Sequence, residues 1–397
     1  RGCPSMVGAA RVNALNRTGV DMNAFALPLA LMLGCVLLEL AALKWWRGQP
    51  VPWRDVILNL NSGHVLMWLC RGVEVAGFTW LYAHASLHWV DGWHPIAGWA
   101  FAFIAWDLGF YWLHRMHHKL GFLWAIHAVH HEGEHFNLSL GVRNAWLSSL
   151  TSLPFFVPLA LLGVTPEMFV AVSGLHYSVQ FYNHCGLVGR SGVLDHFMVT
   201  PANHRVHHGC NPEYIDRNFG GTLLLWDKLF GTYQRALPDV PIRYGVHKPT
   251  HSDNPFWANV VPALQWLGLR TPQLQRDTRA TPAGWIATGG VLLFGAVIDY
   301  VRTDGLWSGK WQAVWFALIL LLTLVLGGLS DGRAWGRWLW PLLALALPVL
   351  MIGICGAGDA LSDTLAVALG LHGLVCGLWH ALRAESPLSS SPHAESR

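Results

Sequence analysis

Long apolar runs alternate with polar connections along this chain. Several runs reach, in whole or in part, the roughly 20 residues that a helix needs to cross a bilayer. Backbone groups in hydrocarbon need internal partners, and the runs lack the alternation of a β-strand, so we predict helices. The predicted fold class is all-α, a polytopic integral membrane helical bundle. The runs cover residues 24–43, 57–82, 95–113, 147–162 and 168–181, and then 284–298, 311–329, 339–354 and 361–382.

A polar, turn-rich interval at about 189–281 separates the two sets of runs, and we expect it to lie outside the bilayer. The first run resembles a retained helix rather than a cleaved signal peptide. Histidine-rich motifs occur only before the interval ends. The predicted organisation is an N-terminal segment 1–23, a catalytic membrane domain 24–248, a connector 249–281, a C-terminal transmembrane helix bundle 282–384 and a disordered tail 385–397.

Composition supports a membrane protein. Hydrophobic residues make up 53% of the chain and charged residues 12%, whereas about 25% is usual for charged residues in soluble proteins. The formal net charge of +3 is small and dispersed, which excludes nucleic acid as a partner. The seven cysteines have irregular spacing and form no C-x-x-C pair, so neither a disulfide framework nor a thiolate metal site is indicated.

Three histidine triplets stand out at 114–118, 127–131 and 204–208, with the sequences HRMHH, HAVHH and HRVHH. Residues three or four apart share one face of a helix, so each triplet can direct two or three imidazoles to one point. His117 faces slightly away from its neighbours, and His184, at the end of an apolar run, reaches the same membrane face. The candidate metal ligands are His114, His118, His127, His130, His131, His184, His204, His207 and His208.

Eight or nine imidazoles exceed the four ligands of a typical zinc site, so two metal ions are indicated. Imidazole binds iron, zinc and copper, and ligand type leaves the element open. Arg115 occupies the position where a zincin has its glutamate, which disfavours metalloprotease chemistry.

Asp107 lies on the same face of its helix as Tyr111, His114 and His118, so we expect its carboxylate to orient a ligand imidazole without binding the metal itself. His135 is left open, and we interpret the remaining single histidines as structural.

Basic residues accompany all three triplets, including Lys119, Arg205 and Arg217. Because positive residues concentrate on the cytoplasmic side of membranes, we predict that the metal site lies on the cytoplasmic face. Lys44 and Arg47, beside the first run, constrain this orientation only weakly.

The region from about Asp107 to Tyr233 resembles the fatty acid hydroxylase and sterol desaturase superfamily of integral membrane di-iron oxygenases. The resemblance rests on FYWLHRMHH, WAIHAVHHEGEHFNLS, TPANHRVHHGCNPEYIDRNFGG and WDKLFGTY. Within the superfamily, FNLS after the second triplet and NHRVHHG with LLLWDKLFGTY are most similar to the alkylglycerol monooxygenase subgroup.

The resemblance implies that eight triplet histidines hold two irons, with His184 as an additional ligand. It implies an O₂-dependent monooxygenase that hydroxylates a C–H bond of a lipid alkyl chain. On an ether lipid, hydroxylation beside the ether oxygen would give a hemiacetal that separates into a fatty aldehyde and a glycerol. The subgroup uses tetrahydrobiopterin, for which we identify no motif here. We find no fused cytochrome, flavin or iron–sulfur segment in the sequence, so an external electron donor is expected.

One position departs from the family pattern. Members commonly have an acidic residue directly after the first H-x-x-x-H, and this chain has Lys119.

The alternative function within the same class is a sterol, fatty acid or carotenoid hydroxylase or desaturase, because the metal motif is shared. From another class, a membrane metal transporter would place ionisable residues within several spans, whereas these histidines gather on one face. The lipid substrate, the choice between hydroxylation and desaturation, the role of the C-terminal bundle and the oligomeric state stay open.

Overall fold

The computed structural model describes residues 25–274, 281–354 and 359–384. The predicted N-terminal segment 1–23 and the tail 385–397 lie outside them. Within these ranges the regular elements are helical, and an isolated antiparallel bridge joins Met198 to Leu223. The all-α fold class is confirmed.

The α-helices fall into three stretches of the chain. Before the polar interval lie α1 (Ala26–Arg47), α2 (Trp53–Asn61), α3 (His64–Ala85), α4 (Pro95–Lys119), α5 (Gly121–His131), α6 (Ser148–Leu162) and α7 (Pro166–Asn183). Within or after the interval lie α8 (Pro201–His207), α9 (Leu225–Leu229) and α10 (Pro255–Trp266). The last stretch holds α11 (Ala283–Arg302), α12 (Gly309–Ser330), α13 (Ala334–Pro348) and α14 (Ala360–Ala384). Shorter helical turns are η3 (Leu138–Val142), η4 (Gly192–His196) and the π-helical η5 (Val349–Ile354).

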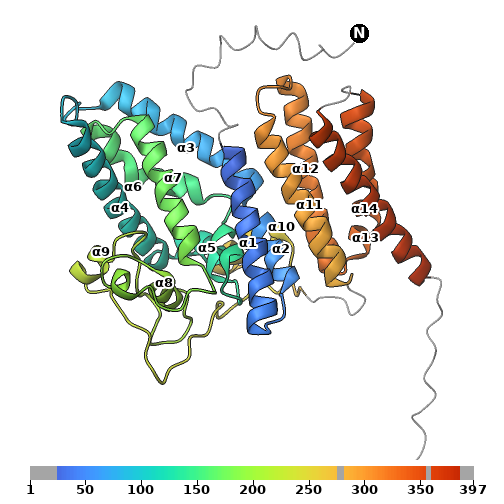
Figure 1. Cartoon of the computed structure of the whole chain (residues 1–397), viewed down its shortest axis with the longest axis horizontal. Helices are drawn as coiled ribbons and strands as arrows, with labels where there is room; N and C mark the ends of the chain where they lie inside the picture. Colours follow the sequence, from blue (N-terminus) through green and yellow to red (C-terminus); the bar gives the residue numbers. More distant parts are fainter. Residues whose placement is uncertain (1–24, 275–280, 355–358, 385–397) are drawn as a thin grey trace, which may run out of the picture.

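Six helices of the described chain are long and apolar enough to cross a membrane: α1, α4, α11, α12, α13 with the start of η5, and α14. The polytopic architecture expected from the apolar runs is therefore confirmed. In Figure 1, α11 to α14 stand together on one side of the molecule, and α3, α4, α6 and α7 on the other. α8, α9 and the polar interval lie at one end of the second group.

One expected span is divided. The run 57–82 is not a single helix, because α2 ends at Asn61 and α3 begins at His64. At the break, Gly63 lies so close to the Asn144 carbonyl that a β-carbon would overlap it. Asn59, at the end of α2, donates to the Ser139 hydroxyl 2.9 Å away. This polar contact attaches α2 to η3, so α2 packs beside the histidine helices.

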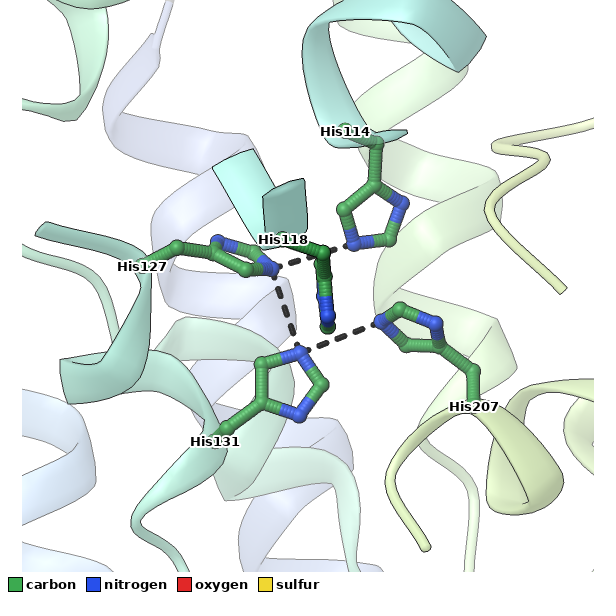
Figure 2. Close-up of side chains that lie close together, drawn as sticks. All are labelled: His114, His118, His127, His131 and His207. Carbon is green, nitrogen blue, oxygen red and sulfur yellow. Dashed lines mark hydrogen bonds between the residues drawn. The ribbon is translucent and has the colours of Figure 1, made fainter. Parts of the chain in front are cut away.

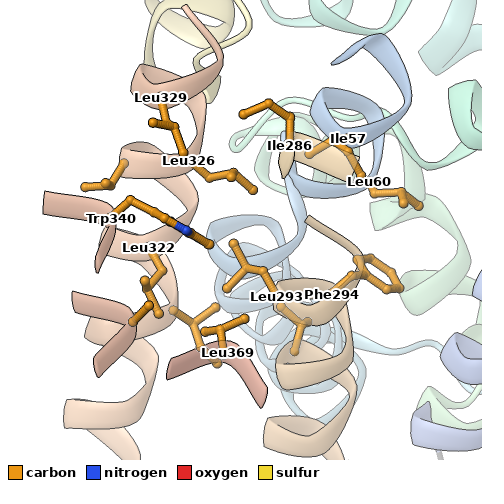
Figure 3. Packing of buried hydrophobic residues seen from close by; sticks show 14 of the residues in the cluster. Ile57, Leu60, Ile286, Leu293, Phe294, Leu322, Leu326, Leu329, Trp340 and Leu369 are labelled. Carbon is orange, nitrogen blue, oxygen red and sulfur yellow. The ribbon is translucent and has the colours of Figure 1, made fainter. Parts of the chain in front are cut away.

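Two hydrophobic cores support the two groups of helices. The first joins α1, α2 and η3 to α11, α12, α13 and α14, with Ile57 and Leu60 packed among Ile286, Leu293 and Phe294 (Figure 3). The second joins α3, α4, α6 and α7 around Trp106, Phe156 and Phe169. The C-terminal helices therefore share one core with the N-terminal helices α1 and α2.

Polar contacts reinforce this junction at the end of α12. The Arg54 guanidinium of α2 donates to the Ser330 hydroxyl 2.9 Å away, and also to the carbonyls of Ser330 and Thr281. The Ser330 hydroxyl in turn donates to the Asp253 carboxylate at 2.7 Å. One arginine of the first part is thus attached to the connector and to the C-terminal helices.

The shared core predicts that the two parts lose stability together. A β-carbon at Gly290 on α11 would overlap the Ile57 side chain of α2. Gly290→Val should therefore overpack the contact between α11 and α2 and lower the free energy of unfolding by about 1–3 kcal/mol. We expect a lower midpoint of thermal unfolding in detergent. Gly284→Val, on the same helix with nothing within 4 Å, is the control. Equal midpoints for the two variants would show that the C-terminal helices are not packed on α2.

Candidate metal centre

All nine candidate histidines come together at one end of the second helix group. They form two sets, in each of which the candidate donor nitrogens lie within 4.8 Å of one another. The first set contains His114, His118, His127, His131 and His207 (Figure 2). The second set contains His130, His184, His204 and His208. Among the described residues, each set consists of histidines alone.

Four helices supply these side chains. α4 provides His114 and His118, one turn apart, and α5 follows immediately after Leu120 with the second triplet. His184 caps α7, and the short α8 presents the third triplet. The triplets on α5 and α8 each divide between the two sets, because adjacent residues on a helix point about 100° apart. The rings of His131 and His208 stack at 4.4 Å between centroids, so the two sets are neighbours.

In the first set the Nε2 atoms converge. His127 Nε2 lies 3.1 Å from the Nε2 atoms of both His114 and His131. His207 Nε2 lies 3.1 Å from His131 Nε2. His118 Nε2 is buried without a hydrogen-bond partner.

The second set repeats this arrangement around His184. Its Nε2 lies 3.0 Å from that of His204, 3.1 Å from that of His208 and 3.3 Å from that of His130. The His204 and His208 Nε2 atoms are 3.1 Å apart. The four rings therefore direct their Nε2 atoms to one point.

Backbone carbonyls determine which ring nitrogen has the lone pair. His114, His130, His184 and His207 each place Nδ1 at 2.7–2.9 Å from a carbonyl oxygen, of Phe219, Arg143, Gln180 and Arg217 respectively. A carbonyl only accepts, so Nδ1 has the proton and Nε2 of the neutral ring has a lone pair. His130 and His184 thus face each other lone pair to lone pair. Such a contact is repulsive unless a cation lies between the rings.

Burial keeps these rings neutral. It lowers the pKa of His130 to about 4, and lowers the pKa of His204, His207 and His208 well below the ordinary value. Neutral imidazole is the form that binds metals. The rings on α5 and α8 are therefore ready to bind a metal at pH 7 without losing protons.

A carboxylate supports the first set from outside. Asp216 Oδ1 lies 3.6 Å from His118 Nδ1, on the side of the ring opposite the unpartnered Nε2. Asp216 Oδ2 accepts from the Lys119 ammonium at 2.5 Å. The contact with His118, and then that with Lys119, lowers the pKa of Asp216 to about 2. Lys119, which departs from the family pattern, thus holds a carboxylate that comes from a distant loop.

Asp107 does not have the expected role. Its carboxylate accepts from the backbone N–H groups of Thr222 and Leu223 and from the Trp226 indole. The imidazole beside it is that of His176, 3.4 Å away, which belongs to neither set. Although Asp107 shares the stripe of His114, it lies about 10 Å earlier along the helix. It fixes the 222–226 turn to α4 and does not orient a candidate ligand.

The other histidines near the triplets lie outside both sets. The His117 ring contacts the Leu113 carbonyl and the Thr151 hydroxyl, at 2.8 and 3.0 Å. The exposed His135 contacts the Asp55 carboxylate at 3.1 Å.

Two residues that no sequence motif marks hold the carbonyl partners in place. Buried Asp227 accepts from the Phe219 and Gly220 N–H groups at 2.7 and 2.8 Å, and so fixes the Phe219 carbonyl used by His114. Arg143, 2% exposed, donates to the Val129 carbonyl, Asn59 and Glu132, while its own carbonyl accepts from His130. Neither belongs to a histidine triplet, and no spacing connects them with the triplets.

Comparison with known proteins identifies the domain that contains these histidines. Residues 99–232 match the sequence model of the fatty acid hydroxylase family. Alkylglycerol monooxygenase of Xenopus tropicalis is 34% identical over 233 residues, which cover 57% of this chain and 50% of that protein. The same enzyme of Danio rerio is 36% identical over 223 residues, covering 55% and 49%.

A bacterial relative is more distant. Ornithine lipid hydroxylase OlsE of Rhizobium tropici is 29% identical over 153 residues, covering 38% of this chain and 46% of that protein. The chain spans about half the length of these curated relatives. No solved structure matches it. The expected resemblance is confirmed: residues 99–232 match the fatty acid hydroxylase family, and all nine histidines of the two sets lie within the matched region.

Proposed function

We propose that this protein is a membrane di-iron monooxygenase that hydroxylates a C–H bond in the alkyl chain of a lipid. The observation that carries the proposal is the pair of adjacent histidine sets at the end of a membrane helix bundle. Similarity to alkylglycerol monooxygenases favours an ether lipid as substrate. Hydroxylation beside the ether oxygen gives a hemiacetal, which separates into a fatty aldehyde and a glycerol.

The residues fit two metal ions. Each set offers at least four neutral nitrogen donors, and the buried Nε2 of His118 has no other partner. Imidazole donors suit iron, and the fatty acid hydroxylase family is iron-dependent. We assign one iron to each set. When bound, the two irons would supply the redox chemistry that activates O₂.

Protein groups around the histidines orient the rings and exclude water. Carbonyls of Phe219, Arg143 and Arg217 hold the rings in one tautomer, and Asp216 supports His118 from behind. Such outer contacts commonly change metal affinity by about 10–100-fold. Burial of the histidines excludes bulk water, which protects a reactive centre from side reactions.

Hydroxylation consumes O₂, two electrons and two protons, placing one oxygen atom in the product and the other in water. We propose an external electron donor for the two electrons. Tetrahydrobiopterin is the candidate reductant suggested by similarity to alkylglycerol monooxygenase, and adding it to the assay tests this directly.

Charge distribution supports a cytoplasmic orientation of the metal centre. Lys44 and Arg47 end α1, Lys119 ends α4 and Arg383 ends α14, all at the end where α8 and α9 lie (Figure 1). Positive residues in short connections favour the cytoplasmic side.

The iron content of the purified protein should depend on both histidine sets. The purified protein is expected to hold about two irons per chain, measured by plasma mass spectrometry. His131→Ala removes a first-set donor and His184→Ala a second-set donor, and each should lower the content to about one iron or less. His117→Ala is the matched control, because His117 belongs to the first triplet but to neither set. Equal loss of iron in all three variants would contradict the assignment.

Lipid turnover tests the activity. Iron-loaded protein in lipid nanodiscs, supplied with O₂ and tetrahydrobiopterin, should release a fatty aldehyde from a 1-O-alkylglycerol, detected by mass spectrometry. The panel includes ornithine lipids, free fatty acids and sterols. His131→Ala should abolish release, whereas His117→Ala should retain it. Hydroxylation of another lipid without ether cleavage would reject the ether-lipid substrate and keep the monooxygenase, and turnover of no lipid by iron-loaded protein would reject both.

Orientation is tested with epitope tags. A tag after Asp239, in the polar interval, should bind antibody only when the antibody is admitted to the cytoplasmic side of the membrane. A tag after Gly305, in the turn between α11 and α12 at the opposite end, should be accessible only from the other side. The reverse pattern would place the metal centre away from the cytoplasm.

A further inference from the structure

The polar interval has an apolar surface that the metal centre does not use. Six large side chains on and beside η4 and α9 are at least one-third exposed, among them Val193 at 73%, Phe197 at 66% and Leu229 at 64%. We call this set the η4–α9 patch. It comprises Val193, Leu194, Phe197, Leu225, Leu229 and Phe230.

Backbone contacts bring the two segments of the patch together. The Leu224 N–H donates to the Phe197 carbonyl at 2.9 Å, next to the bridge between Met198 and Leu223. The Lys228 ammonium of α9 donates to the His196 carbonyl of η4 at 2.5 Å. The exposed side chains therefore come from two segments that lie side by side, although about 30 residues separate them in the sequence.

This surface continues the outer side of a membrane helix. The Phe230 ring packs against Trp112 of α4, with centroids 5.1 Å apart, and Trp112 is itself exposed. α4 is one of the candidate spans. On the other side, the Tyr182 hydroxyl of α7 lies 3.2 Å from the Ser191 hydroxyl beside η4. The patch is thus attached to the ends of α4 and α7, the helices that present His114 and His184.

Basic and amphipathic groups lie beside the apolar side chains. The Arg115 guanidinium lies 5.4 Å from the Trp112 ring, and exposed Lys228 lies on α9 next to Leu229. Tryptophan together with lysine or arginine is typical of the headgroup region, where basic side chains contact phosphates while apolar ones enter the acyl layer.

We propose that the η4–α9 patch is immersed in the headgroup and upper acyl region of the leaflet on the metal-centre side. The bilayer is the expected partner because the patch extends a surface that already faces lipid. A lipid entering there would reach the ends of α4 and α7 without crossing water. This last step rests on the proposed function, whereas contact of the patch with the bilayer does not.

Photolabelling of the unmodified protein tests the immersion. The full chain is reconstituted in nanodiscs of phosphatidylcholine and phosphatidylglycerol. It is then labelled with a diazirine fatty acid in the lipid, or separately with a water-soluble diazirine. Peptide mass spectrometry should find the lipid reagent on residues 193–197 and 225–230. The water-soluble reagent should modify Ile215 and Leu237, exposed apolar residues of the same interval outside the patch.

Two results would overturn the proposal. Labelling of the patch from water, to the extent seen at Ile215, would make it a solvent-facing surface. Protection from both reagents would mean that a second copy of the chain or another protein covers it. Because the experiment needs neither iron nor turnover, its outcome is independent of the proposed function.

A charge variant provides a second measurement. Leu229→Glu should abolish lipid-borne labelling of residues 225–230 and leave labelling of α4 unchanged. Ile215→Glu is the matched control and should change neither. Retained lipid labelling in Leu229→Glu would show that α9 does not depend on its apolar side chains for membrane contact, and would contradict the proposal. Loss of α4 labelling would report misfolding, in which case the unmodified protein decides.

Discussion

The histidine centre depends on the repulsion between imidazole lone pairs that the fold forces together. Carbonyl groups fix the protons of His130 and His184 on Nδ1, so their Nε2 atoms, 3.3 Å apart, face each other as acceptors. The energy of this arrangement becomes favourable only when cations lie between the rings. The protein therefore contributes a preorganised set of imidazole donors, and much of the organisation around it serves to hold that set in place.

Charged residues away from the histidines provide this support. Arg143 joins α5 to α2, Asp227 fixes the Phe219 loop, and Asp107 ties the following turn to α4. Each is buried and paired, so loss of one partner would leave an uncompensated polar group. The ligand geometry and the stability of the surrounding loops are thus connected through the same contacts.

The sequence was most informative where the pattern was local. Helical spacing within each triplet selected eight of the nine histidines and set His117 apart, because ligand direction on a helix follows from residue number. The ninth, His184, was selected because it ends an apolar run. It could not divide the nine into two sets, since that division depends on how α5 and α8 face each other. It also could not locate Asp216, which lies nearly a hundred residues from Lys119 and meets it only in the folded chain.

The apolar runs gave the fold class but not the packing between runs. The break at Gly63 depends on the carbonyl of Asn144, and the exposed apolar side chains of η4 and α9 occur in a segment that composition marks as polar. The position of Asp107 could not be predicted from the helix face that it shares with His114. Shared direction along a helix says nothing of distance along its axis, and two turns are enough to give a residue different neighbours.

The first core has a consequence for biogenesis. α1 and α2 are synthesised early, yet their packing partners in α11 to α14 begin more than 200 residues later. At ribosomal rates of about 5–20 residues per second, these two helices wait tens of seconds with an apolar face uncovered. Lipid can cover the apolar face of the candidate span α1 during this interval, so the first core is completed only after the last four helices emerge.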